Sequence, residues 1–256
     1  MRLVQQAANT ADFDVLSDDV PVFRVLVPEH IQAGGMEAVH GVHMIHSSWE
    51  SLLDGMKGTF RACDELEVTT TVTTSGETEV EICISFKNLS DHDLTDLDAD
   101  ICTALNHLPG TPGWANLSFF GGVPLDRDIQ GIMWYEDIAP RRLLALTDDG
   151  WAAMHPSPDS AGAEGVPRYN RVRSDAPGAI GCAVSGPDGE SHFFQMWKTD
   201  CYYRNTFPGN ACMHLVPVVC AGLAPGKIAE IRGVVGFFEG SRDALARRMR
   251  QFRAGD

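Results

Sequence analysis

Short runs of apolar and β-branched residues, separated by turns rich in Gly, Pro, Asn and Asp, recur along this chain of 256 residues. The clearest pair covers residues 65–74 and 79–88, two Thr/Val/Ile-rich runs joined by a Gly-containing turn. Such a pair predicts an antiparallel hairpin. From Val80 to Phe86 every second residue is apolar and the others are polar or Cys, as expected for a strand with one buried face.

Similar runs elsewhere predict most of the remaining secondary structure. Strands are expected at residues 21–27, 36–45, 94–105, 132–135, 143–146, 179–184, 192–197, 215–220 and 228–238. Residues 48–56, SWESLLDGM, leave open a helical turn, a loop or a strand. One helix is expected near the end of the chain, capped by Ser241, because Leu245, Met249 and Phe252 recur at helical spacing.

Many short strands, frequent turns and one terminal helix predict an all-β fold. We expect an antiparallel β-sandwich, with the large supersandwich as one form of it, and a single C-terminal helix. No internal repeat and no composition boundary divides the sequence, so residues 1–256 are expected to form a single domain. Two long Gly- and Pro-rich stretches, 106–128 and 155–178, are expected to be loops.

Charge and cysteine content exclude several classes of function. The formal net charge is −15, which disfavours nucleic acid or an anionic membrane as a partner. No apolar stretch suits a signal peptide or a membrane span, so we expect a cytoplasmic protein, and self-association into a homo-oligomer stays open. Seven scattered cysteines favour neither a disulfide framework nor a zinc ribbon. Most should be buried apolar residues; Cys201 and Cys212 have neighbours that make a role worth testing.

Motifs for nucleotide binding, zinc proteolysis and serine hydrolysis are missing, so no nucleotide cofactor is expected. The acidic side of the strand at 94–105 is expected to be a solvated face, because the calcium-loop pattern is also missing. Any chemistry must therefore come from groups scattered over strands and loops.

The densest set of such groups lies in residues 195–217 and comprises Trp197, Cys201, Tyr202, Tyr203, Arg204, Asn205, Cys212 and His214. We expect His214 to act as a base or a metal ligand and Tyr202 or Tyr203 to act as an acid. Arg204 and Asn205 would hold substrate hydroxyl or carboxylate groups. The alternative is that the tyrosines are half-buried strand residues and His214 is a structural histidine.

Two further sets of residues are candidates for the same site. Trp114 and Trp197 offer aromatic faces of the kind that stack on sugar rings, and His107 is a further candidate for substrate binding. Imidazole nitrogens bind divalent metals, so His43 and His46 are the candidate metal ligands if they meet His107 and His214 in one cleft. The spacing is not that of a recognised metal motif, and ordinary polar histidines are the alternative.

Four segments carry a resemblance to a known group of proteins: ISFKNLSDHDL, DADICTALNHLPG, NACMHLVP and LAPGKIAEIRGVVGFFEG. Over roughly residues 80–245 the chain resembles a family of uncharacterised bacterial β-sandwich proteins from carbohydrate-degrading contexts. In it, Cys212, His214 and Pro217 match a C-x-H-x-x-P element. The resemblance implies a sugar-related role centred on His214 and names no reaction.

Two functions from different classes follow. The leading hypothesis is an enzyme that acts on a sugar or sugar-acid derivative by general acid/base proton transfer, in a lyase, isomerase or hydrolase step. The runner-up is a non-catalytic carbohydrate-binding or accessory subunit. Both predict a small-molecule or saccharide ligand, and the first leaves a divalent metal open.

Overall fold

The computed structural model describes residues 1–5, 11–17, 20–34, 36–40, 48–62, 64–104, 143–153, 178–185, 189–203 and 212–255. The strands are β1 (Arg2–Gln5), β2 (Asp12–Ser17), β3 (Val20–Ala33), β4 (Met36–His40), β5 (Ser48–Ser51), β6 (Gly55–Ala62), β7 (Leu66–Ser75), β8 (Glu79–Asn88), β9 (Leu94–Ala104), β10 (Leu143–Thr147), β11 (Gly150–Ala153), β12 (Ala179–Ser185), β13 (Ser191–Tyr203), β14 (Cys212–Leu223) and β15 (Ile228–Glu239). The helix α2 spans Arg242–Ala254.

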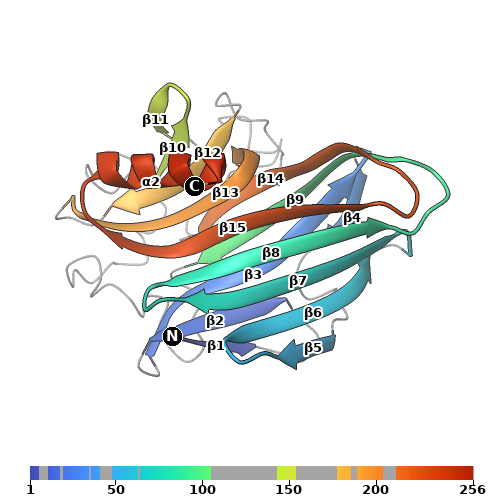
Figure 1. Ribbon diagram of the computed structural model, residues 1–256, viewed down its shortest axis with the longest axis horizontal. Helices are drawn as coiled ribbons and strands as arrows, with labels where there is room; N and C mark the ends of the chain where they lie inside the picture. Colours follow the sequence, from blue (N-terminus) through green and yellow to red (C-terminus); the bar gives the residue numbers. More distant parts are fainter. Residues whose placement is uncertain are drawn as a thin grey trace, which may run out of the picture.

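The strands of the described residues belong to one antiparallel sheet, whose main path runs β1-β2-β3-β9-β14-β13-β15-β8-β7-β6-β5. The sheet curls so that β3 and β9 lie behind β15, β8 and β7 (Figure 1). The main core fills the space between these layers, where the Phe23 ring of β3 packs against the Phe237 ring of β15 with centroids 5.7 Å apart. The predicted all-β, sandwich-like fold with a C-terminal helix is confirmed.

The hairpin predicted at residues 65–88 is present as β7 and β8. The two strands pair continuously from Leu66 opposite Asn88 to Ser75 opposite Glu79. The apolar residues of β8 are buried and the residues between them are half-buried or exposed. The alternation in the sequence therefore correctly predicts which face of this strand is buried.

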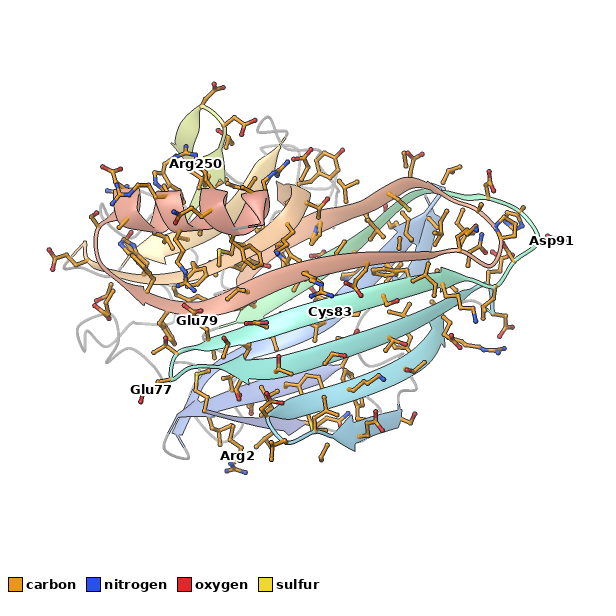
Figure 2. The ribbon with its side chains drawn as sticks, viewed as in Figure 1. Arg2, Glu77, Glu79, Cys83, Asp91 and Arg250 are labelled. Atoms are coloured by element: carbon orange, nitrogen blue, oxygen red, sulfur yellow. The ribbon has the colours of Figure 1, made fainter. Side chains whose placement is uncertain are left out.

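Helix α2 begins where the sequence predicts. The Ser241 side chain accepts a hydrogen bond from the backbone N–H of Ala244, 3.3 Å away. Leu245 and Met249 are fully buried against the outer face of β12, β13 and β15, where they form a second cluster with Phe194. Arg248 of α2 and Glu79 of β8 form an ion pair that links the helix to the sheet. Figure 2 labels Glu79.

Replacing Ser241 by Ala is expected to lower the free energy of unfolding by about 1 kcal/mol, because one N-terminal amide of α2 loses its acceptor. Urea unfolding followed by circular dichroism measures the change. Ser241→Asp keeps an acceptor and should remain close to wild type. Equal losses in both variants would contradict the capping role.

Three regions go beyond the sequence-based expectation. Residues 48–62 form strands β5 and β6, and the Trp49 ring packs edge-on against Phe13 at 4.5 Å. Strand β3 continues through residue 33 rather than ending at 27, and β13 reaches Tyr203. The predicted strand at 132–135 and most of both predicted long loops lie outside the described residues. Within the described part of the chain, no helix is long and apolar enough to cross a bilayer.

Candidate functional site

Three neighbouring strands, β3, β9 and β14, bring polar residues to the face of the sheet that points away from the main core. On β14, Met213 and Leu215 point into the core, so His214 between them points to the opposite face. Cys102 lies directly opposite His214 on β9, and Asp100 is two residues further along the same face. His30 of β3 is opposite Asp100. Pairing alone therefore gathers four chemically active side chains.

A β-bulge adds a fifth side chain, Glu29. Between Leu26 and His30 strand β3 advances four residues, whereas β9 advances only two, from Cys102 to Asp100. Strict alternation would point Glu29 to the same side as Ile31, into the core. The extra residues break the alternation, and a bulge of this kind redirects side chains next to functional sites.

The contacts of Glu29 link the two sides of this group. Its Oε2 lies 3.2 Å from His214 Nε2, and its Oε1 lies 3.8 Å from His30 Nε2. Ligating atoms of Glu29, Cys102 and His214 all lie within 4.8 Å of one another, as do those of Glu29, His30 and Asp100. We call these five residues the β3–β9–β14 cluster.

The cluster is almost entirely removed from solvent. His214 is 1% exposed, Asp100 is 0% exposed, and the Glu29 side chain retains 14%. Charged forms of buried groups are costly unless another charge or a metal ion compensates them. Carboxylates and imidazoles held together in such a place can exchange protons with a ligand or bind a cation.

Tyr202 shares the face of this cluster. It lies opposite Val216 on β14, and Val216 is two residues from His214 on the same side of the strand. Diagonal neighbours of this kind have Cα atoms about 7–8 Å apart, within reach of a phenol ring. Tyr202 is half-buried. The sequence-based pairing of a tyrosine with His214 is thus compatible with the register, whereas the side chain of Tyr203 lies outside the described part.

Trp197 occupies a different place. Its side chain is fully buried in the main core, and its indole Nε1–H donates a hydrogen bond to Gln195 Oε1 at 3.0 Å. The Gln195 amide in turn donates to the backbone carbonyl of Met213. The structure therefore does not bring Trp197 to the face that carries His214, and its ring does not form a wall of this site.

Six other candidates from the sequence lie outside the described residues: His43, His46, His107, Trp114, Arg204 and Asn205. Their roles in metal or substrate binding stay predictions. Sequence reasoning missed four of the five cluster residues, namely Glu29, His30, Asp100 and Cys102. It assigned Asp100 to a solvated face. That assignment is wrong for Asp100, which is fully buried, and holds for Asp96, which is exposed.

None of Cys83, Cys102, Cys182, Cys201 and Cys220 forms a disulfide bond. Burial raises the pKa of the Cys201 thiol well above its ordinary value, with Cys182 nearby adding to the shift. Burial, followed by the charge of Glu230, raises the pKa of Cys83 to about 11. High thiol pKa values make these cysteines poor nucleophiles. The expectation that most cysteines are buried apolar residues agrees with Cys182 and Cys201, whereas the buried Cys102 belongs to the cluster.

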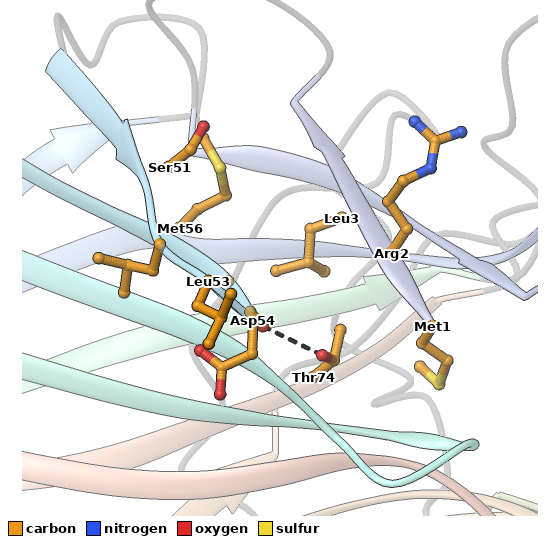
Figure 3. A pocket seen from close by; sticks show the side chains of 10 residues that line it. Met1, Arg2, Leu3, Ser51, Leu53, Asp54, Met56 and Thr74 are labelled. Atoms are coloured by element: carbon orange, nitrogen blue, oxygen red, sulfur yellow. Dashed lines mark hydrogen bonds between the residues drawn. The ribbon is translucent and has the colours of Figure 1, made fainter.

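Two surface pockets lined by described residues lie away from the cluster. One, of about 300 Å³, is formed by the N-terminus and the β5–β6 turn, where Thr74 Oγ1 donates to the carbonyl of Asp54 (Figure 3). The other, of about 290 Å³, lies beside the end of α2 and includes Cys83, Lys198 and Arg232. Neither holds a group of convergent imidazoles and carboxylates like that around His214.

Comparisons with known proteins give no sequence relatives: no protein-family model matches the chain, and no curated protein matches it. Among solved structures, it is similar to a candidate aldose 1-epimerase from Klebsiella pneumoniae subsp. pneumoniae MGH 78578 (TM-score 0.42, 11% identity, covering 92% of this chain and 67% of that one). A GalM/aldose epimerase homologue from C. elegans is similar at a TM-score of 0.43 and 8% identity, with 91% and 94% covered.

A third similar structure is a candidate kojibiose phosphorylase from the human microbiome, with a TM-score of 0.39 and 11% identity. The match covers 96% of this chain but 29% of that one. With TM-scores of 0.39–0.43, these likenesses carry no function over to this chain.

Proposed function

We propose that this protein is an enzyme that acts on a sugar or sugar-acid derivative by proton transfer, in a lyase, isomerase or hydrolase step. The observation that carries the proposal is the approach of Glu29 Oε2 to His214 Nε2, 3.2 Å apart on a buried face. A carboxylate and an imidazole in this arrangement are the residue types that exchange protons with substrates near neutral pH.

The rest of the cluster supports this chemistry. His30 and Asp100 stand on the other side of Glu29 and add a second imidazole and a second carboxylate. Tyr202, on the same face, is the proposed acid. Its phenol would protonate the oxygen on which negative charge develops, while the cluster accepts the proton that leaves carbon or oxygen.

The saccharide class comes from the sequence resemblance and from the residues that follow Tyr202. Arg204 and Asn205 come directly after β13 in the chain and supply donors suited to hydroxyl and carboxylate groups. His107 comes three residues after the end of β9, close in sequence to Cys102 of the cluster. We propose these three, with Trp114, as substrate-binding residues, and Trp197 is not part of the set.

The proposal is tested by incubating the protein with a panel of sugars and sugar acids in D₂O and following the ¹H NMR spectra. Proton transfer at carbon should exchange a C–H for C–D or give a new product, in excess of a heat-inactivated control. Saturable binding across the panel with neither exchange nor product would contradict the enzyme proposal and favour a binding subunit.

A further inference from the structure

We propose that the β3–β9–β14 cluster binds one divalent transition-metal ion of the zinc type, with Glu29, Cys102 and His214 as its protein ligands. This places the metal at a ligand set different from His43 and His46. The inference rests on the proposed function for the location of the site. It assigns Glu29 and His214 the role of ligands, which leaves His30 and Asp100 as the proton acceptors of the cluster. Its test uses metal alone and no turnover.

The backbone positions two of the ligands by direct pairing. Cys102 and His214 are opposite each other on adjacent antiparallel strands, β9 and β14. Side chains of directly opposed residues leave the sheet on the same side, with Cβ atoms about 4.5–5.5 Å apart. A thiol and an imidazole that start at that separation can reach one ion without any movement of the backbone.

The third ligand approaches from β3 because of the bulge. Leu26 lies opposite Cys102 on β3, yet it is Glu29, three residues further, whose carboxylate oxygen reaches 3.2 Å from His214 Nε2. A bulge that carries a carboxylate to the centre of a three-strand group has a structural cost, since it interrupts the β3–β9 ladder. If Glu29 is a metal ligand, the bulge is explained because it places the Glu29 carboxylate beside His214.

The spacing fits a coordination sphere. The three ligating atoms lie within 4.8 Å of one another, and the Glu29–His214 pair is 3.2 Å apart. In a tetrahedral site with bonds of about 2.0 Å to nitrogen and oxygen and 2.3 Å to sulfur, neighbouring ligand atoms are roughly 3.3–3.6 Å apart. Side-chain movements of up to about 1 Å would bring the three ligating atoms from their present separations to those of a tetrahedral site.

Charge and ligand type select the metal. A deprotonated Cys102 and an ionised Glu29 would place two negative charges in a site where Cys102 is 3% and His214 is 1% exposed. A divalent cation neutralises both. Sulfur and imidazole ligands favour Zn²⁺ or Co²⁺ over Mg²⁺ and Ca²⁺, which prefer oxygen. Three protein ligands also match the number in catalytic zinc sites, in which the fourth position takes water or substrate.

The neighbouring trio of Glu29, His30 and Asp100 is the competing ligand set. It shares Glu29 but offers no sulfur, so the two sets differ in their spectra with cobalt. A thiolate ligand gives an intense sulfur-to-cobalt charge-transfer band in the near ultraviolet, which nitrogen and oxygen ligands do not give. Cobalt therefore reports directly whether Cys102 is bound.

The test uses untagged protein treated with a chelator, loaded with Zn²⁺ or Co²⁺ and dialysed. We expect roughly one equivalent of metal by elemental analysis, and an affinity at least about tenfold weaker in Cys102→Ser and His214→Ala. Cobalt-loaded wild type should show the charge-transfer band, and Cys102→Ser should lack it. Cys220→Ser is the matched control, because Cys220 is another thiol on β14, six residues from His214.

Three results would overturn the proposal. One is retention of much less than one equivalent of metal by the wild type. Another is equal behaviour of Cys102→Ser and Cys220→Ser. The last is loss of binding in Asp100→Asn with no effect of Cys102→Ser, which would place the ion in the competing set. Because none of these readouts uses a substrate, failure of the metal proposal is distinct from failure of the deuterium-exchange test.

Discussion

Replacing His214 by Ala is expected to lower turnover at least about 100-fold, because the cluster loses its central imidazole. The melting temperature, measured after removal of bound metal with a chelator, should stay within about 4 °C of wild type. His214 lies outside the main core, so its removal leaves the packing between the layers intact. Turnover is measured on the substrate found by deuterium exchange and expressed per folded molecule.

A second buried histidine provides the matched control. His192 is fully buried, its Nε2–H donates to the carbonyl of Gly240 at 2.8 Å, and its Nδ1 accepts from the Ser185 hydroxyl at 2.9 Å. His192→Ala should therefore cost about 2–4 kcal/mol of stability with unchanged turnover per folded molecule. If His214→Ala lost stability but kept its turnover per folded molecule, as expected for His192→Ala, His214 would be a structural residue. That result would contradict the proposed function.

Trp197→Ala is expected to produce the largest loss of stability, about 3–5 kcal/mol. The indole is fully buried, and its N–H is bonded to Gln195. Its ring also lies against Gly233, where a Cβ would come within 2.6 Å of ring atoms. A globular domain of ordinary stability has only about 5–15 kcal/mol, so this variant should unfold at far lower urea concentration.

Two comparisons make the Trp197 result interpretable. Trp197→Phe keeps most of the ring volume but leaves Gln195 Oε1 without the indole donor, so an intermediate loss of about 1–3 kcal/mol is expected. Leu53→Ala, at a fully exposed position, should change stability by no more than about 0.5 kcal/mol. A nearly wild-type stability of Trp197→Ala, with weakened ligand binding, would instead support Trp197 as part of a binding wall.

Local patterns in the sequence predict the local parts of the fold well. The hairpin of β7 and β8 and the helix α2 each depend on residues close in sequence, and both are found where the periodicity and the Ser241 cap place them. The strands β5 and β6, within residues 48–62, could not be predicted from local patterns in the same way. The Trp49 ring of β5 packs against Phe13, which is distant in sequence, so this contact cannot be predicted from local patterns.

The cluster depends on non-local register, which a single sequence does not contain. His214 stands out as a candidate because its sequence neighbours are polar and aromatic. Asp100 looks like one of several acidic residues on a solvated face, but in the structure it is fully buried and lies opposite His30. Glu29 gives no periodic signal, since a bulge and not alternation directs it toward His214.

The central claim is that three strands assemble one chemical centre around His214. Crystals of zinc-loaded protein, measured on both sides of the zinc absorption edge, test it most directly. We predict an anomalous peak bonded at about 2.0–2.3 Å to Cys102 Sγ, a nitrogen of His214 and a carboxylate oxygen of Glu29. A peak held by His43 and His46 instead, or Glu29, Cys102 and His214 standing apart with no peak between them, would contradict the claim.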